Sequence, residues 1–204
     1  MSADPITEPV SKWQDPADLL VALEEAYGEP VRAEFVEGIP ILPPQPNLNH
    51  NRGAFKLATQ LELAGFIAAT NSGFRITGKG RRPDALVIPD FFVLHREATE
   101  MDEAYCKAHK GWYSIDLVTL VGEVTSTNHT TDSGPKYHSY AAAGVPVYVL
   151  IHRQEGKAYA FSDPVPNEDP DKAYYGDRVE VKLGHTLPLP APYPALETAF
   201  MVAG

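Results

Sequence analysis

The run from Leu117 to Val124 constrains the fold of this chain most, because it is almost continuously apolar. A strand with one face in solvent alternates apolar and polar residues, whereas a strand covered on both faces does not. The run therefore predicts a central strand buried on both sides. A second apolar run, Val147 to Ile151, predicts another buried strand, and a helix is expected between the two, over Asp132 to Ala143.

Further elements are expected on either side of this centre. Helices are predicted from Asp15 to Gly28, from Asn47 to Gly65 and near 97–108, strands at 32–36, 39–42, 66–69, 74–77 and 84–88, strand-like pieces at 158–161, 173–175 and 178–183, and a short helix after 194. This order predicts an α/β fold, an α+β mixed sheet flanked by helices, with an N-terminal helix and β-hairpin. We expect residues 1–14 to form a flexible tail and residues 15–204 a single domain.

Composition excludes several classes of protein. The single Cys106 excludes a disulfide framework, and no stretch reaches the roughly 18 apolar residues of a membrane helix. The start of the chain lacks a secretory signal. We therefore expect a cytoplasmic protein without membrane association. The net charge of −10 disfavours nucleic-acid binding. However, a basic run free of acidic residues contains Arg75, Lys79, Arg81 and Arg82. This run is either solvated surface or a contact for the DNA backbone.

Two carboxylates fall at the ends of apolar strands. Glu123 shares a strand face with Val121, and Asp84 begins the strand 84–88. Burying a carboxylate is costly unless a cation compensates it, and paired carboxylates are typical ligands of Mg²⁺ or Mn²⁺. We therefore expect Asp84 and Glu123 to lie within roughly 6 Å of each other, with the carbonyl of Val124 as a further ligand. The alternative is that Glu123 caps a loop or pairs with an arginine.

Lys136 belongs to the helix expected after this strand. Asp132, Lys136 and Tyr140 are spaced four residues apart, so they lie on one helical face. From that face a lysine can reach the end of the strand, where it would orient a water molecule or stabilise a pentavalent phosphate. The alternative is an exposed ion pair between Asp132 and Lys136.

Taken together, these residues resemble the Uma-type (Uma-two) putative restriction endonuclease family of the PD-(D/E)XK nuclease superfamily. The segments that carry the resemblance are, in chain order, residues 34–38, His50, residues 82–84, residues 122–126, Asp132 with Lys136 and Tyr140, and residues 143–148. The resemblance extends from about residue 32 to residue 200, which is most of the chain.

The resemblance implies a restriction-endonuclease-like core that cleaves DNA with a divalent metal, Mg²⁺ or Mn²⁺. In this resemblance Asp84 and Glu123 match the acidic residues of the superfamily motif, and Glu34 matches an additional acidic residue near the site. His50 would contact a phosphate or a metal-bound water. The superfamily lysine two residues after the glutamate is Thr125 here, and Lys136 takes its place.

We therefore expect an endonuclease in which a metal-activated water attacks a DNA phosphodiester. Asp84 and Glu123 would hold the metal, Lys136 would position the water, and the basic run would hold the DNA backbone. The alternative is a catalytically weak or inactive nuclease-fold module with a DNA-binding or regulatory role, which the acidic net charge and the displaced lysine favour. Because cutting both strands takes two active sites, a homodimer is also expected.

Overall fold

The strands form two mixed sheets in a computed structural model that describes residues 15–28, 32–43, 45–78, 84–125, 132–167 and 169–202. The tail expected at 1–14 lies outside these ranges. The five-stranded sheet has the order β2-β1-β5-β4-β7, with β1 Glu34–Val36, β2 Ile39–Ile41, β4 Phe74–Ile76, β5 Ala85–Val87 and β7 Tyr113–Ser114. The six-stranded sheet has the order β11-β10-β9-β8-β6-β3, with β3 Ile67–Ala69, β6 Phe91–Leu94, β8 Val118–Val124, β9 Val147–His152, β10 Lys157–Val165 and β11 Tyr174–Lys182.

The apolar run at 117–124 forms β8, which confirms the prediction of a central strand. It lies between β6, to which it is antiparallel, and β9, to which it is parallel. Both of its faces are covered, because Leu120 contributes to one hydrophobic core and Val121 to another. At Gly122 the ring of Phe91 from β6 lies where a side chain would stand, so only glycine fits beside this phenylalanine.

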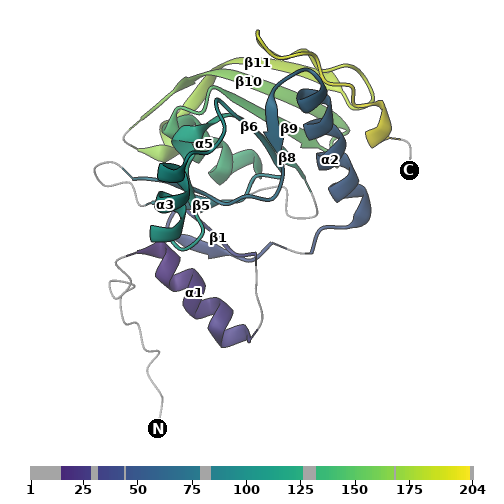
Figure 1. The fold of residues 1–204 in the computed structure, drawn as a ribbon. Helices are drawn as coiled ribbons and strands as arrows, with labels where there is room; N and C mark the ends of the chain where they lie inside the picture. Colours follow the sequence, from purple (N-terminus) through teal and green to yellow (C-terminus); the bar gives the residue numbers. More distant parts are fainter. Residues whose placement is uncertain are drawn as a thin grey trace.

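Helices cover the sheets from several sides, and the described ones are α1 Pro16–Tyr27, α2 Leu48–Leu63, α3 Glu100–Ala108 and α5 Tyr137–Ala143. Leu20 of α1 packs on Phe35 and Leu86, on the outer face of the five-stranded sheet. Figure 1 shows α1 at the foot of the molecule beside β1, and α2 along the flank of β8 and β9. Leu57 of α2 belongs to the core on that side of the six-stranded sheet. None of these helices is long and apolar enough to cross a membrane.

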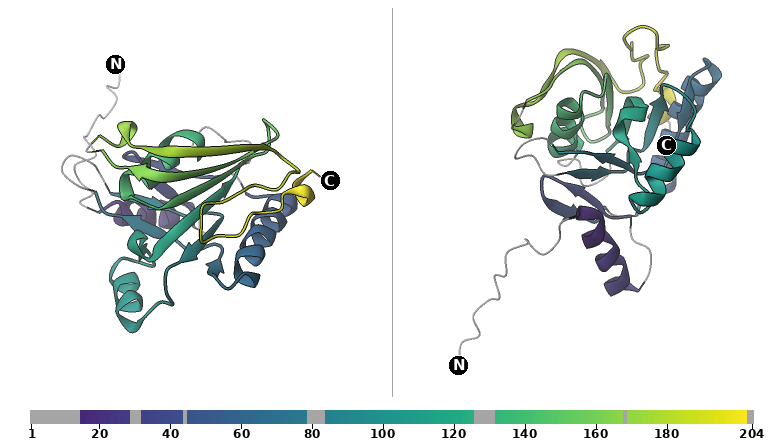
Figure 2. Two further views of the ribbon diagram at one scale, coloured as in Figure 1. Left: turned by 90° about the horizontal axis from the view of Figure 1, so that it is seen from above. Right: turned by 60° about the vertical axis from the view of Figure 1, so that its left-hand side comes forward.

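A shared core fills the space between the two sheets. It joins Phe74 and Val87 of the five-stranded sheet to Val121 and Tyr148 of the six-stranded sheet, with Tyr140 of α5 beside them. The two views of Figure 2 show the C-terminal segment beside α2, where the side chain of Gln60 bonds the backbone of Glu197. The expected α/β class with a mixed sheet, an N-terminal helix and a β-hairpin is therefore confirmed.

The structure differs from the expected elements in several places. The strand β6 was not expected, and α3 begins at Glu100 rather than near residue 97. The pieces expected at 158–161, 173–175 and 178–183 are parts of two long strands, β10 and β11. Pro164 is tolerated inside β10 because it lies beyond the pairing with β9 and faces only β11. The short C-terminal helix is a single 3-10 turn over Ala199–Met201.

Candidate active site

Glu123 is the centre of a buried polar cluster between the two sheets. It lies one residue before the end of β8, and the period of two places it on the same face as Val121, toward the shared core. Its side chain is only 2% exposed. A carboxylate in this position requires compensating partners, because an isolated buried charge is very unfavourable.

Lys136 and Tyr140 supply these partners from one face of the following helical segment. The chain forms a wide π-helical turn over Asp132–Lys136 and continues directly into α5. The Lys136 ammonium lies 3.1 Å from Glu123 Oε1, and the Tyr140 hydroxyl donates to the same oxygen at 2.8 Å. The four-residue spacing of Asp132, Lys136 and Tyr140 thus aims all three toward the strand end, with Asp132 Oδ1 3.9 Å from the ammonium.

Glu34 reaches the same ammonium from the other sheet. It lies on β1, and Glu34 Oε1 is 2.8 Å from Lys136 Nζ. The same oxygen accepts a hydrogen bond of 2.6 Å from the backbone N–H of Ile88, at the end of β5. Lys136 therefore joins a carboxylate of the five-stranded sheet to a carboxylate of the six-stranded sheet.

Asp90 and His50 lie beside this cluster, and Asp90 was not singled out from the sequence. Asp90 directly precedes β6, and its Oδ2 accepts a 2.8 Å hydrogen bond from the N–H of Val124. The same oxygen lies 3.0 Å from Nε2 of His50, in the first turn of α2. The signal that could have revealed Asp90 is Pro89-Asp90 immediately before Phe91–Leu94, which repeats the Pro83-Asp84 pattern six residues earlier.

Asp84, which was expected to share a metal with Glu123, does not lie in this cluster. In β5, Ala85 and Val87 face the shared core, so the period of two turns Asp84 and Leu86 to the opposite face, toward α1. There the Asp84 carboxylate accepts hydrogen bonds from the Arg75 guanidinium and from the N–H of Gly78. The expected convergence of Asp84 and Glu123 is thus corrected: Asp90 is the aspartate beside Glu123.

Arg75, expected to contact DNA, is engaged on that same outer face. Its guanidinium bonds Asp84 and also both carboxylate oxygens of Asp15, the N-cap of α1, at 2.9 and 3.0 Å. Through these contacts Arg75 has a structural role, because it links the start of α1 to the five-stranded sheet. The other three residues of the basic run, Lys79, Arg81 and Arg82, lie outside the described residues.

Thr125, at the position of the superfamily lysine, links two strand ends instead. Its buried hydroxyl donates to Gln154 Oε1 at 2.7 Å and accepts from the N–H of Arg153 at 3.0 Å. The ammonium group near Glu123 comes from Lys136, whose side chain is 5% exposed. The carbonyl that Val124 was expected to offer lies on the same strand end, beside the N–H that binds Asp90.

The charges in this cluster alter one another's protonation. Burial raises the pKa of Glu123 well above its usual range, although Lys136 acts in the opposite direction. Burial likewise raises the pKa of Asp132 to about 6. For Lys136, burial disfavours the charged form, but Glu123 and Glu34 outweigh it and raise its pKa. Burial also opposes the charged form of His50, yet the hydrogen bond to Asp90 raises its pKa above the usual value.

The oxygen donors of the cluster are of the type that a hard divalent cation prefers. The carboxylates of Glu34, Asp90, Glu123 and Asp132 influence one another electrostatically, and all four act on Lys136. Carboxylate oxygens are the ligands that Mg²⁺ prefers. Within the described ranges, no three His, Cys, Asp or Glu side chains form a ready metal-binding group. The ammonium of Lys136 takes the place between Glu34 and Glu123.

The fold is of the restriction-endonuclease-like class, and acidic residues and a lysine lie at the end of its central strand. A family model for Uma2, described as "Putative restriction endonuclease", matches residues 18–198. The chain therefore belongs to the Uma2 family.

Among solved structures, the fold is similar to that of a putative nuclease belonging to DUF820 from Anabaena variabilis ATCC 29413. The TM-score is 0.55 at 15% sequence identity, over 89% of this chain and 97% of the other. At that identity the likeness concerns the fold alone. No curated protein matches the sequence.

Proposed function

We propose that this protein is a divalent-metal-dependent endonuclease that hydrolyses phosphodiester bonds of DNA in the cytoplasm. The observation that carries the proposal is the buried ion cluster of Glu123, Glu34 and Lys136 at the end of the central strand. Taking each ion out of water costs several kcal/mol, and hydrophobic residues would serve stability equally well. Charged groups with strongly shifted pKa values are concentrated at functional sites. Membership of the Uma2 family supports the same conclusion.

Asp90 and Glu123 are the residues that would hold the metal, together with the carbonyl of Val124. A bound Mg²⁺ or Mn²⁺ would polarise the scissile phosphate and lower the pKa of a coordinated water. Asp90 replaces Asp84 in this assignment because its Oδ2 lies against the strand end that carries Glu123. His50 holds Asp90 in place through its 3.0 Å contact.

Lys136 is assigned two tasks in the reaction. Its ammonium would orient the attacking water and would stabilise the negative charge that develops on the phosphate oxygens. The surrounding carboxylates raise its pKa, so the side chain remains charged across the physiological range. Glu34 positions this ammonium, and the Tyr140 hydroxyl restrains Glu123 by bonding its Oε1.

The test compares two aspartates that follow prolines in the same way. Plasmid DNA is incubated with Mg²⁺ or Mn²⁺ and with wild type, Asp90→Asn, Glu123→Gln or Asp84→Asn. Asp90→Asn and Glu123→Gln should lower the cleavage rate by about two to four orders of magnitude. The matched control Asp84→Asn should retain the rate, because Asp84 faces α1. Loss of cleavage in Asp84→Asn alone, in a folded protein, would contradict the assignment of Asp90.

One observation favours the alternative of a nuclease-fold DNA-binding or regulatory module with weak or absent catalysis. The Lys136 ammonium occupies the space between Glu34 and Glu123, where a metal would also be expected to bind. In that case DNA would bind, but no cleavage would be detected with Mg²⁺ or Mn²⁺ at any pH between 6 and 9. Metal-dependent nicking abolished by Glu123→Gln would exclude this alternative.

A further inference from the structure

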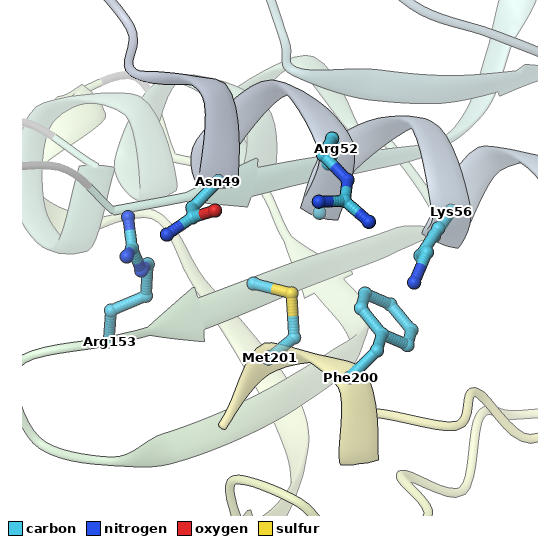
Figure 3. Close-up of a pocket in the computed structure, with 7 residues that line it drawn as sticks. Asn49, Arg52, Lys56, Arg153, Phe200 and Met201 are labelled. Carbon is cyan, nitrogen blue, oxygen red and sulfur yellow. The ribbon is translucent and has the colours of Figure 1, made fainter. Parts of the chain in front are cut away.

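A positively charged pocket lies on the other side of the strand end from Glu123, between α2 and the C-terminal segment. It encloses about 160 Å³, and its lining consists of Asn49, Arg52, Gly53, Lys56, Arg153, Phe200 and Met201. Three of these side chains are cationic, and none is acidic. Figure 3 shows Arg52 and Lys56 on α2, with Arg153 across from them and Phe200 and Met201 below.

The cations of this pocket differ from most others in the protein. Arg75, Arg96, Lys110, Lys157, Lys172 and Arg178 all form ion pairs with carboxylates. Within the described parts of the chain, Arg52, Lys56 and Arg153 form no ion pair with a carboxylate. Lys56 instead lies over the ring of Phe200, with its Nζ 4.8 Å from the ring centroid. Three unpaired cations around one pocket, in a chain of net charge −10, indicate a site for an anion.

The shape of the pocket depends on the close approach of two segments. A Cβ at Gly53 would lie 2.8 Å from Met201 Sδ, so glycine lets the C-terminal turn lie directly against α2. Met201 and Phe200 then form an apolar base beneath the cationic side chains. The cations are thereby held around a recess rather than spread over a flat surface.

The pocket is joined to the candidate active site on two of its sides. Asn49 precedes His50, which contacts Asp90 at 3.0 Å. The N–H of Arg153 donates to Thr125, two residues after Glu123. A strand of nucleic acid whose scissile phosphate lay at Glu123 could therefore continue past this end of the sheet toward the pocket.

We propose that the Arg52–Lys56–Arg153 pocket binds a backbone phosphate of the nucleic-acid strand, at some distance along the strand from the phosphate that is cleaved. This inference rests on the proposed nuclease function, because it identifies how the same site would hold its substrate. Guanidinium and ammonium groups bind phosphate oxygens of any sequence, so the pocket contributes affinity and positioning without base recognition.

The experiment measures binding separately from cleavage. Labelled duplex and single-stranded DNA are titrated in EDTA, by fluorescence anisotropy at several salt concentrations, with wild type, Arg52→Gln, Lys56→Gln, Arg153→Gln and the triple variant. Lys107→Gln is the matched control, because Lys107 is also exposed and lies on α3, away from the pocket. Circular dichroism verifies that each variant is folded.

Each lost phosphate contact should reduce the slope of log K against log salt by about 0.7–0.9. Because the pocket holds one phosphate, the triple variant should show this change in full, which at 0.1 M salt corresponds to an affinity about five- to eight-fold weaker, and each single variant should show part of it. Lys56→Arg should retain binding, and Lys107→Gln should change neither quantity. In cleavage assays the variants should raise KM while kcat is preserved.

Three outcomes would overturn the proposal. The first is a triple variant whose salt slope and DNA affinity equal those of wild type. The second is a wild type that does not bind DNA at tens of micromolar. The third is a pocket that binds inorganic phosphate in calorimetry although the variants bind DNA as well as wild type does. Binding that depends on the pocket in a wild type that never cleaves DNA would instead support the pocket and contradict the proposed nuclease activity. The two proposals can therefore fail separately.

Discussion

Replacing Lys136 by methionine removes the charge that joins the two sheets and leaves a side chain of similar length. The ammonium pairs with Glu34 at 2.8 Å and with Glu123 at 3.1 Å, and both carboxylates are at most 4% exposed. An exposed ion pair would contribute less than about 1 kcal/mol. Removing one partner of a buried pair costs about 3–5 kcal/mol, because the remaining charge stays buried without compensation. We therefore expect Lys136→Met to lower the free energy of unfolding by about 3–5 kcal/mol at pH 8.

The loss should depend on pH in a defined direction. Burial raises the pKa of Glu123 well above its usual range and that of Asp132 to about 6, so the folded state binds protons that the unfolded state has released. Stability from such groups is present at low pH and is lost as the pH rises through their folded-state pKa values. At pH 5 the carboxyls of the variant can take up protons, so the cost of Lys136→Met should fall toward about 1 kcal/mol.

Urea unfolding in EDTA at pH 5 and pH 8, followed by circular dichroism, measures both quantities. The double variant Glu34→Gln/Lys136→Met provides the internal control, because neutralising one carboxylate should recover part of the stability at pH 8. An equal loss at both pH values, or a loss below 1 kcal/mol at pH 8, would refute the argument that the two carboxylates depend on this ammonium. Cleavage by Lys136→Met, compared under conditions where it is folded, should be slower by about two to four orders of magnitude.

Three further predictions concern the same cluster and the assembly. In calorimetric titration, Glu34→Gln should weaken Mn²⁺ binding less than Asp90→Asn does, because the Glu34 carboxylate is already bonded to Lys136 and to the backbone of Ile88. An equal weakening of Mn²⁺ binding would show that Glu34 is a metal ligand. Burial raises the pKa of Asp132 from its usual 3.8 to about 6, so its ionised form destabilises the folded state at pH 8. Asp132→Asn should therefore raise the free energy of unfolding by on the order of 3 kcal/mol at pH 8 in EDTA, and should remove part of the pH dependence of stability between pH 4 and 6. An unchanged urea midpoint at pH 8 would contradict this. If the proposed endonuclease cuts both strands as a homodimer, light scattering at micromolar concentration should give twice the chain mass of 22.3 kDa, and a monomer mass would favour a nicking activity instead.

The sequence is most informative where burial or spacing is local. The run at 117–124 predicts β8 almost to the residue, because a strand covered on both faces is apolar at most positions of either face. The four-residue spacing of Asp132, Lys136 and Tyr140 likewise places these side chains on one face before any tertiary contact is known. Their approach to Glu123 follows, since the helical segment comes soon after the strand.

The choice between Asp84 and Asp90 could not be made in this way. Both follow a proline and both precede an apolar strand, so their local signals are the same. They differ in which strands pair: β6 lies next to β8, whereas β5 belongs to the other sheet and turns Asp84 toward α1. Strand pairing is a long-range property, and it decides which aspartate reaches the site. The full length of β10 and β11 was not predicted, although pieces of both strands were, because their polar residues and Pro164 are acceptable at the margin of a sheet.

The contact between Phe91 and Gly122 has a consequence for how this protein can change in evolution. The ring lies on the bare backbone of Gly122, one residue before Glu123, while Phe91 itself follows Asp90. A larger residue at position 122 would displace the ring and, with it, the aspartate beside it. The two positions should therefore accept only changes that conserve their combined volume. A library randomised at both positions and selected for folding should yield coupled pairs, in which a side chain gained at 122 is matched by a smaller one at 91.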